Sequence, residues 1–135
     1  MYLPHAQTTV VVLSNIYSSA TTTIGYDIAA LSLGLPCQPF HLEKHAPSPS
    51  ELKSSTGTFQ FGSDFYQPNA KVALIANARG LSLRWPSGSV SSLIPVDRDR
   101  FVDRSYWEEV KIERDAMGNV TAFAYGQFRG TIAAP

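Results

Sequence analysis

The chain has 135 residues with 11 Lys and Arg against 11 Asp and Glu, so its formal net charge is zero. This balance disfavours a general binder of nucleic acid or of anionic membranes, because a protein that binds either of these negatively charged partners needs an excess of basic residues. One cysteine, Cys37, excludes an internal disulfide framework, and no apolar run approaches the roughly 18 residues that span a bilayer. The apolar run at residues 9–13 is short and lacks a basic flank, so we see no signal peptide, and the compartment stays open.

The first 35 residues predict a strand followed by a helix. The β-branched run from Thr8 to Ser14 (TTVVVLS) is typical of a strand that is buried on both faces in the middle of a sheet. Apolar residues at spacings of four, three and four then form one stripe of a helix: Ile24, Ile28, Leu31 and Leu35. Ser18 or Ser19 would cap this helix at its start, and Gly34 and Pro36 would end it.

Residues 36–56 are rich in proline and predict an extended linker with a short helix from Ser50 to Ser55, capped by Ser50. The letters SELK, from Ser50 to Lys53, also match the Ser-x-x-Lys pattern of a nucleophile that is activated by a lysine. A helix cap in a solvated linker is the favoured interpretation.

A second candidate in the linker is a zinc site. Cys37, His41 and His45 are spaced by four residues, and Glu43 lies between the two histidines. The neighbouring prolines disfavour the helix that would hold these spacings, so we expect a surface linker, no metal and no cofactor.

Residues 57–135 predict about seven or eight short strands with close turns, which favours an antiparallel curled sheet or a lipocalin-like barrel. The fold class is therefore mainly β with one N-terminal helix. The expected strands cover residues 58–61, 70–77, 81–85, 90–96 and 127–133, together with the two arms of a hairpin at residues 106–125, and residues 100–103 are a short piece that carries Phe101. Pro95 would restrict its strand to a sheet edge or a strand end.

The hairpin turns at residues 115–119, where Gly118 and Asn119 are expected to supply positive φ angles. Before the turn, Val110 and Ile112 alternate with charged residues, and the same alternation is expected to continue after it. We interpret Glu108, Glu109 and Glu113 as a solvated face and not as a pair of catalytic carboxylates, and residues 97–104 (DRDRFVDR) as a salt-bridged surface loop.

An aromatic set is the remaining candidate binding site. It comprises Trp85, Phe101, Tyr106, Trp107, Phe123 and Tyr125. These rings would either line a cavity for one small apolar ligand or fill the barrel interior, and the second use is favoured in a β region of this size.

Two stretches resemble parts of a known family. TTVVVLSNIYSSATTTIGYDIAALSLGLP is similar to the last strand and helix of the serine β-lactamase-like fold of penicillin-binding proteins, class C β-lactamases and related esterases and peptidases. GTFQFG, LSLRWPSG and the run from IPVDRD to QFRG resemble the lipocalin-like β domain that often follows this fold. The shared features are Gly57-Thr58-Phe59, Phe101, Trp107, the turn from Arg114 to Gly118, and Phe128-Arg129.

The resemblance implies that the chain is the C-terminal part of a larger serine hydrolase. The catalytic Ser-x-x-Lys, Tyr/Ser-x-Asn and Lys/His-x-Gly motifs of that family would lie upstream of Met1, so we expect no catalysis by this chain. Residues 1–35 would be a strand–helix remnant, and residues 57–135 an accessory domain that packs on the hydrolase, shapes its cleft or mediates assembly. The alternative is a free-standing lipocalin-like binder of a small apolar ligand.

The expected partner is therefore a missing or separate hydrolase domain. A remnant with an apolar strand and an apolar helix stripe would expose a sticky surface unless something covers it. We expect the strand from Thr8 to Ser14 and the stripe from Ile24 to Leu35 to dock on the β domain or on a second copy of the chain. No nucleic acid and no membrane span are expected.

Overall fold

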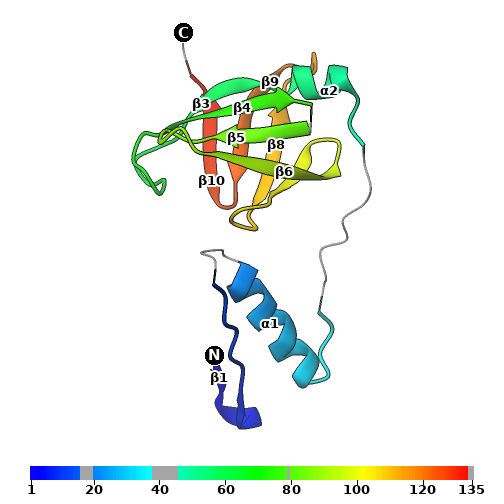
Figure 1. The fold of residues 1–135 in the computed structure, drawn as a ribbon, viewed down its shortest axis with the longest axis vertical. Helices are drawn as coiled ribbons and strands as arrows, with labels where there is room; N and C mark the ends of the chain where they lie inside the picture. The colour runs from blue at the N-terminus through cyan, green and yellow to red at the C-terminus, as the bar shows by residue number, and fades with distance from the viewer. Residues whose placement is uncertain (16–19, 38–45, 79, 134–135) are drawn as a thin grey trace. The chain divides into compact units, whose positions relative to one another are not determined.

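A computed structural model describes residues 1–15, 20–37, 46–78 and 80–133 of the chain. The chain divides into two compact units, Met1–His41 and Leu42–Pro135 (Figure 1). The first unit contains β1 (Tyr2–Leu3), a 3₁₀ turn (Pro4–Ala6), β2 (Thr8–Thr9) and α1 (Ala20–Ser32). The second contains α2 (Pro49–Ser54), β3 (Gly57–Gln60), β4 (Lys71–Asn77), β5 (Gly80–Arg84), β6 (Val90–Asp97), β7 (Arg100–Asp103), β8 (Glu109–Arg114), β9 (Val120–Tyr125) and β10 (Phe128–Ile132).

The expected strand from Thr8 to Ser14 is wrong beyond its first two residues. Strand β2 pairs antiparallel to β1, and the backbone pairing extends by one residue because the Val10 N–H donates to the Met1 carbonyl (2.9 Å) and the Met1 amino group donates to the Val10 carbonyl (2.8 Å). The expectation of two buried faces is wrong as well: Val10 is buried, but Val11 is 71% and Leu13 is 90% exposed. Residues 10–14 are an extended segment that lies outside the described strand ladders.

The expected helix is confirmed as α1, and its end has the predicted form. Gly34 has a φ of 67°, the Leu35 N–H donates to the Ala30 carbonyl (2.9 Å), and the Gly34 N–H donates to the Leu31 carbonyl (3.1 Å). These two bonds form a Schellman motif, in which a glycine adopts the left-handed conformation that ends a helix. The expected caps Ser18 and Ser19 lie outside the described residues.

Helix α1 packs on the extended segment through its small residues. Gly25 and Ala29 are the buried residues of α1, and a Cβ atom added to Gly25 would lie 3.8 Å from Val12 Cγ2. Ile24, Ile28 and Leu31 of the apolar stripe lie about 100° further around the helix, because successive residues are separated by that angle, whereas Leu35 follows Gly34 beyond the end of α1. The stripe is consequently exposed, with fractions of 46%, 44%, 62% and 54% for Ile24, Ile28, Leu31 and Leu35.

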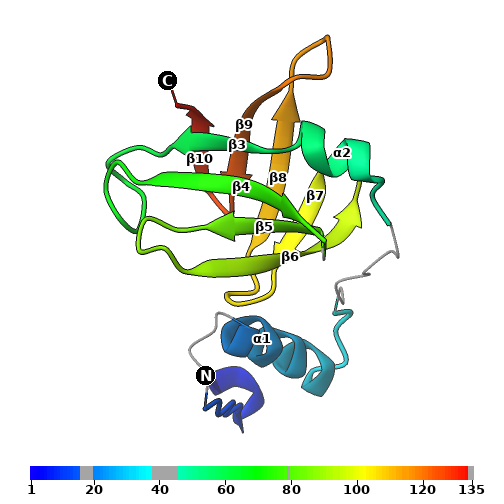
Figure 2. The ribbon, with the colours of Figure 1, turned by 45° about the horizontal axis from the view of Figure 1, so that its top comes forward.

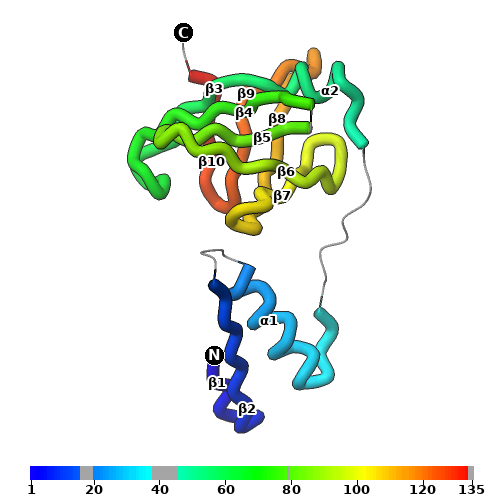
Figure 3. Tube along the Cα trace, in the orientation of Figure 1, coloured from blue at the N-terminus to red at the C-terminus, as the bar shows by residue number. Residues whose placement is uncertain are grey.

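The second unit is a closed antiparallel barrel with the strand order β10-β3-β4-β5-β6-β7-β8-β9 (Figures 2 and 3). This architecture confirms the predicted fold class. Closure joins the last strand to the first, with Ile132 opposite Phe59. The barrel therefore has no free edge for Pro95, and the expectation for this residue is wrong. Pro95 instead sits where the register between β6 and β7 shifts, and such an irregularity tolerates a residue without an N–H.

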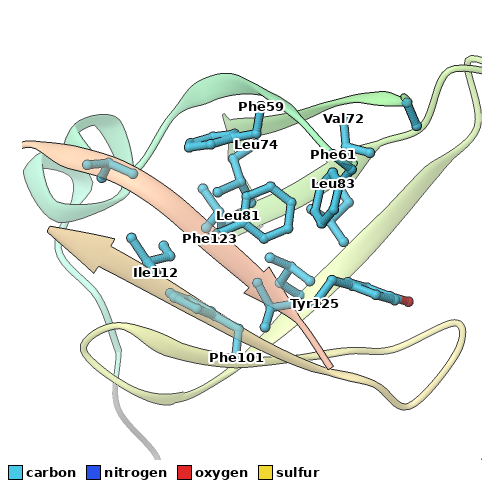
Figure 4. Close-up of a cluster of buried hydrophobic side chains, with 14 of the residues drawn as sticks. Phe59, Phe61, Val72, Leu74, Leu81, Leu83, Phe101, Ile112, Phe123 and Tyr125 are labelled. Atoms are coloured by element: carbon cyan, nitrogen blue, oxygen red, sulfur yellow. The ribbon is translucent and has the colours of Figure 1, made fainter. Parts of the chain in front are cut away.

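The barrel interior is filled by phenylalanine rings and aliphatic side chains from most strands (Figure 4). Phe123 lies at the centre of this set, where its ring meets the edges of Phe59 (centroids 4.9 Å apart) and Phe61 (5.1 Å). Edge-to-face contacts at such distances are favourable beyond the area they bury. Phe101 and Val110 are also almost fully buried.

The central hairpin is confirmed, but two details differ from the expected alternation. The register shifts by one residue between Glu113 and Arg114, and this bulge places Phe123 on the inner face although Val120 also faces inward. Within the turn, Gly118 has a positive φ (86°) and Asn119 does not. Asn119 contributes through hydrogen bonds instead, since its N–H and its side-chain amide both donate to the Asp115 carboxylate.

The N-cap of helix α2 lies two residues before the expected cap. Ser48, not Ser50, is the N-cap, and it forms a capping box with Glu51. Pro49 occupies the first helical turn, where its missing N–H costs nothing, so the serine before it becomes the cap. Leu52 of this helix packs against the barrel core.

Candidate functional site at the aromatic end of the barrel

The two ends of the barrel differ in chemistry. Antiparallel strands alternate in direction, so the loops that follow β3, β5, β7 and β9 meet at one end, while α2 lies at the other (Figures 1 and 2). We call the first of these the aromatic end. It gathers six rings: Phe65, Tyr66, Trp85, Tyr106, Tyr125 and Phe128.

Phe65 lies at the centre of the aromatic end. Its ring stacks on Phe61 (4.0 Å between centroids, 22° between planes) and lies parallel to Trp85 (6.3 Å, 11°). The edges or faces of three further rings surround it at 5.2–6.2 Å: Tyr66, Phe128 and Tyr125. Phe65 is only 4% exposed, and Phe61 and Ala70 of the same connection between β3 and β4 are buried with it.

A buried carboxylate lies beside these rings. Asp103, the last residue of β7, is fully buried, and its Oδ2 accepts hydrogen bonds from Ser91 Oγ (3.0 Å) and Tyr125 Oη (2.9 Å). Its Oδ1 accepts from the Ser105 N–H (2.8 Å), and Ser91 Oγ in turn accepts from Trp85 Nε1 (3.1 Å). Hydrogen bonds to both oxygens compensate for removing the carboxylate from water.

This network fixes the orientation of two walls of the aromatic end, Trp85 and Tyr125. Figure 4 shows the Tyr125 hydroxyl directed away from the phenylalanine cluster. Burial raises the pKa of Tyr125 well above its usual value, and the negative charge of Asp103 raises it further. Tyr125 therefore stays a neutral hydrogen-bond donor, and the arrangement positions aromatic rings and does not hold an exposed nucleophile.

The structure brings together half of the predicted aromatic set. Trp85 meets Tyr106 (5.9 Å) and Tyr125 (5.3 Å) edge to face at the aromatic end. Phe101 and Phe123 instead belong to the interior, as the packed-core interpretation predicted. Trp107 lies between β7 and β8 with a φ of 60°, and its N–H donates to the Asp103 carbonyl (2.7 Å).

Sequence reasoning missed the residues that organise the site. The interpretation of residues 97–104 as a surface loop is wrong for Arg100–Asp103, which forms β7 and ends in the buried Asp103. Charge alternation suggested solvent, yet Phe101, Val102 and Asp103 of this run are all buried, and Phe101 belongs to the barrel core. Phe65 carried one available signal, since it is an apolar residue among polar loop residues (GSDFYQPN).

The other sequence candidates lie elsewhere. Ser50 is exposed, and its Oγ lies 3.0 Å from Ser48 Oγ at the start of α2, in keeping with a helix terminus. His41, Glu43 and His45 lie outside the described residues; among those that are described, no cluster of His, Cys, Asp or Glu could hold a metal ion.

The three candidate glutamates fit the predicted solvated face where contacts are described. Glu109 pairs with Arg100 (2.8 Å), and Glu113 pairs with Arg129 (2.7 Å), across the outer surface of the barrel. The Arg129 guanidinium, chiefly through its hydrogen bonds, lowers the pKa of Glu113. Exposed ion pairs of this kind contribute little to stability.

Comparison with known proteins assigns no family to this chain. The sequence matches no protein-family model and no curated protein. None of the described helices is long and apolar enough to cross a membrane. The candidate site is therefore defined by its own chemistry, which is a cluster of aromatic rings in which Trp85 and Tyr125 are held by the hydrogen-bond network of Asp103.

Proposed function

We propose that the chain is a non-catalytic accessory module, the C-terminal part of a serine β-lactamase-like hydrolase, which packs on the catalytic domain, shapes its cleft or mediates assembly. The proposal is based on the sequence resemblance described above. The structural observation that supports it best is the surface of the first unit. There, α1 covers the extended segment with Gly25, while apolar side chains point away from both elements.

This surface exposes apolar side chains of the kind that are normally buried inside a larger α/β domain. Val11 and Leu13 of the extended segment and the stripe of α1 are exposed together on one small unit. Burying an aliphatic side chain is worth about 1.5–3 kcal/mol, so a partner that covers several of them gains considerable free energy. A sheet strand beside residues 10–14 and the neighbouring helices of a catalytic domain would supply this cover.

The filled barrel interior favours an accessory module over the alternative, a free-standing lipocalin-like binder of a small apolar ligand. Such a binder needs an internal cavity. Here the Phe123 ring contacts both Phe59 and Phe61 in the interior, and each of the three is at most 2% exposed.

The first test is to read the coding DNA upstream of Met1. We expect an in-frame segment that encodes Ser-x-x-Lys and the other two catalytic motifs of the family. The proposal would be contradicted by an in-frame stop codon directly upstream of Met1, with no reading frame that encodes these motifs in the DNA before it.

The second test uses the proteins themselves. The upstream domain and this chain, produced as separate polypeptides, should form a stable complex, and Ile28→Asp with Leu31→Asp should abolish it because two buried charges would be unpaired. Thr23→Asp is the matched control, since Thr23 is exposed on α1 away from both the stripe and Gly25. Equal binding by the stripe variant and the control would show that the stripe is not the interface.

A further inference from the structure

We infer that residues 11–13 are the unpaired edge of an incomplete sheet, and that the polypeptide directly upstream of Met1 pairs with this edge as an antiparallel strand. The inference deepens the proposed function and rests on it, because it needs the longer protein that the accessory role implies. It adds the partner segment, its direction and its register, none of which follows from the exposed apolar surface alone.

The ladder between β1 and β2 continues beyond its labelled strands. After the pair of Tyr2 with Thr9, Met1 and Val10 form one more pair. The Val10 N–H donates to the Met1 carbonyl (2.9 Å), and the Met1 amino group donates to the Val10 carbonyl (2.8 Å). Two reciprocal bonds of this kind define a hydrogen-bonded pair of an antiparallel ladder. The ladder is therefore regular up to this pair.

The next residues of the second strand have no backbone partner. Within the described part of the chain, the N–H and C=O groups of residues 11–13 form no hydrogen bond. Val11 and Leu13 are also 71% and 90% exposed, so the run is accessible to a partner. A row of unpaired backbone groups that continues a ladder is a template for a further strand.

The pair of Met1 with Val10 sets the register of that further strand. Hydrogen-bonded and non-hydrogen-bonded pairs alternate along an antiparallel ladder, so every second residue directs its backbone groups to the same side. Val12 therefore directs its N–H and C=O groups to the side on which Val10 bonds to Met1. A strand that continues the line of β1 upstream would place its second residue before Met1 opposite Val12, and these two residues would exchange both bonds.

The side chains of the run fit this arrangement. Val10 is buried, and a Cβ atom added to Gly25 would lie 3.8 Å from Val12 Cγ2, so one face of the run lies against α1. Val11 and Leu13 alternate with these residues and point to the opposite face. Residues that lie opposite each other in a ladder share a face. We therefore expect the second upstream residue to be small or apolar, like its partner Val12.

The experiment compares three forms of the full chain by NMR-detected amide hydrogen exchange: the chain as it stands, the chain with the residues that its coding DNA encodes directly upstream, and the chain with a synthetic Val-Thr-Val-Thr extension. We expect both extensions to slow exchange of the Val12 amide at least about 10-fold, because a ladder-bonded amide exchanges only when the pairing opens. The Val11 and Leu13 amides point to the other edge and should change by less than about twofold. The Val10 amide is bonded to Met1 in the chain as it stands and serves as the reference for an intact ladder.

Proline at two neighbouring upstream positions supplies a matched pair of variants. Proline at the second position before Met1 removes the N–H that would donate to the Val12 carbonyl, so the protection of Val12 should fall. Proline at the first position removes an N–H that faces away from Val12, and an edge strand tolerates this, so the protection should remain.

The inference is overturned if neither extension protects Val12, or if Val11 and Leu13 gain as much protection as Val12, since cover without alternation is not strand pairing. If the natural upstream segment leaves Val12 unprotected although the three catalytic motifs lie upstream, the inference fails and the proposed function stands. Protection of Val12 by a natural upstream segment without those motifs would support the inference and contradict the proposed function. A reading frame that is closed directly upstream of Met1 would overturn both.

Discussion

Arg114 and Ser55 are 59 residues apart in the sequence, yet Arg114 Nη2 donates to Ser55 Oγ over 2.7 Å. The same guanidinium donates from Nε to Asp99 Oδ1 (2.8 Å) and from Nη1 to the carbonyl of Gly118 (3.1 Å). One side chain of β8 thus joins the end of α2, the β6–β7 loop and the central hairpin turn. Because the Arg114 side chain is only 12% exposed, solvent screens these bonds weakly.

Replacing this arginine should destabilise the barrel more than replacing an exposed one. Hydrogen bonds to charged groups contribute about 1.5–3 kcal/mol each when buried, so we expect Arg114→Met to lower the free energy of unfolding by about 2–3 kcal/mol. Arg129→Met removes the exposed pair with Glu113 and should cost less than about 1 kcal/mol. Urea denaturation measures both values, and equal losses would show that Arg114 acts as an ordinary surface residue.

The link between α2 and β8 also predicts where the barrel unit begins. A chain that starts at Ala46 retains the capping box and Leu52, and we expect it to unfold in one cooperative transition. A chain that starts at Gly57 loses α2 and the Ser55 partner of Arg114, so its midpoint in urea should be clearly lower. If both shortened chains unfold at the same urea concentration, α2 does not belong to the cooperative unit.

Alkaline pH should destabilise the chain through Tyr125. Burial and the charge of Asp103 raise its pKa above the usual value of 10.0, so the unfolded chain loses this proton at a lower pH than the folded one. The stability contributed by the protonated hydroxyl is complete below pH 10 and is lost as the pH rises above it. Tyr125→Phe should therefore flatten the decline of stability between about pH 10 and 11.5. Denaturation curves across this range measure the slope, and parallel slopes for wild type and variant would contradict the assignment.

The exposed stripe of α1 should drive association when the chain is alone. We expect concentration-dependent sedimentation for the isolated chain, and a shift toward monomer for Ile28→Asp with Leu31→Asp, because exposed aliphatic patches tend to pair. Thr23→Asp again serves as the control. If the chain is a monomer at all concentrations, a second copy of the chain does not cover this surface.

The barrel was predictable from the sequence because its strands carry local signals. Alternation in β5 and β8, Gly118 in the turn and the spacing of turns every few residues all pointed to an antiparallel sheet. The sequence did not distinguish a curled sheet from a closed barrel. Closure depends on the pairing between Ile132 and Phe59, and neither segment alone carries a signal for that pairing. The strand predicted from Thr8 to Ser14 was wrong because the sequence does not show which backbone partners are present. Its residues favour a strand, but in the described structure its backbone partners are Met1 and β1, and a strand exists only where backbone partners do.

The site was less predictable, because its organising residues look ordinary along the chain. Asp103 lies among alternating charges, and nothing local distinguishes it from Asp97 or Asp99. Its role follows from the inner face of β7 and from a tyrosine 22 residues away. Phe65 is separated from Trp85 by β4 and β5, so their parallel rings are a product of barrel geometry.

Closure through β3 and β10 has a consequence for how such a barrel is combined with other proteins. Both strands have their outer termini at the end that carries α2, since β3 starts there and β10 finishes there. The polypeptide thus enters and leaves the barrel at the end that carries α2. A barrel with both connections at one end can be appended to another domain, or inserted into a loop of that domain. Neither connection then passes over the aromatic end.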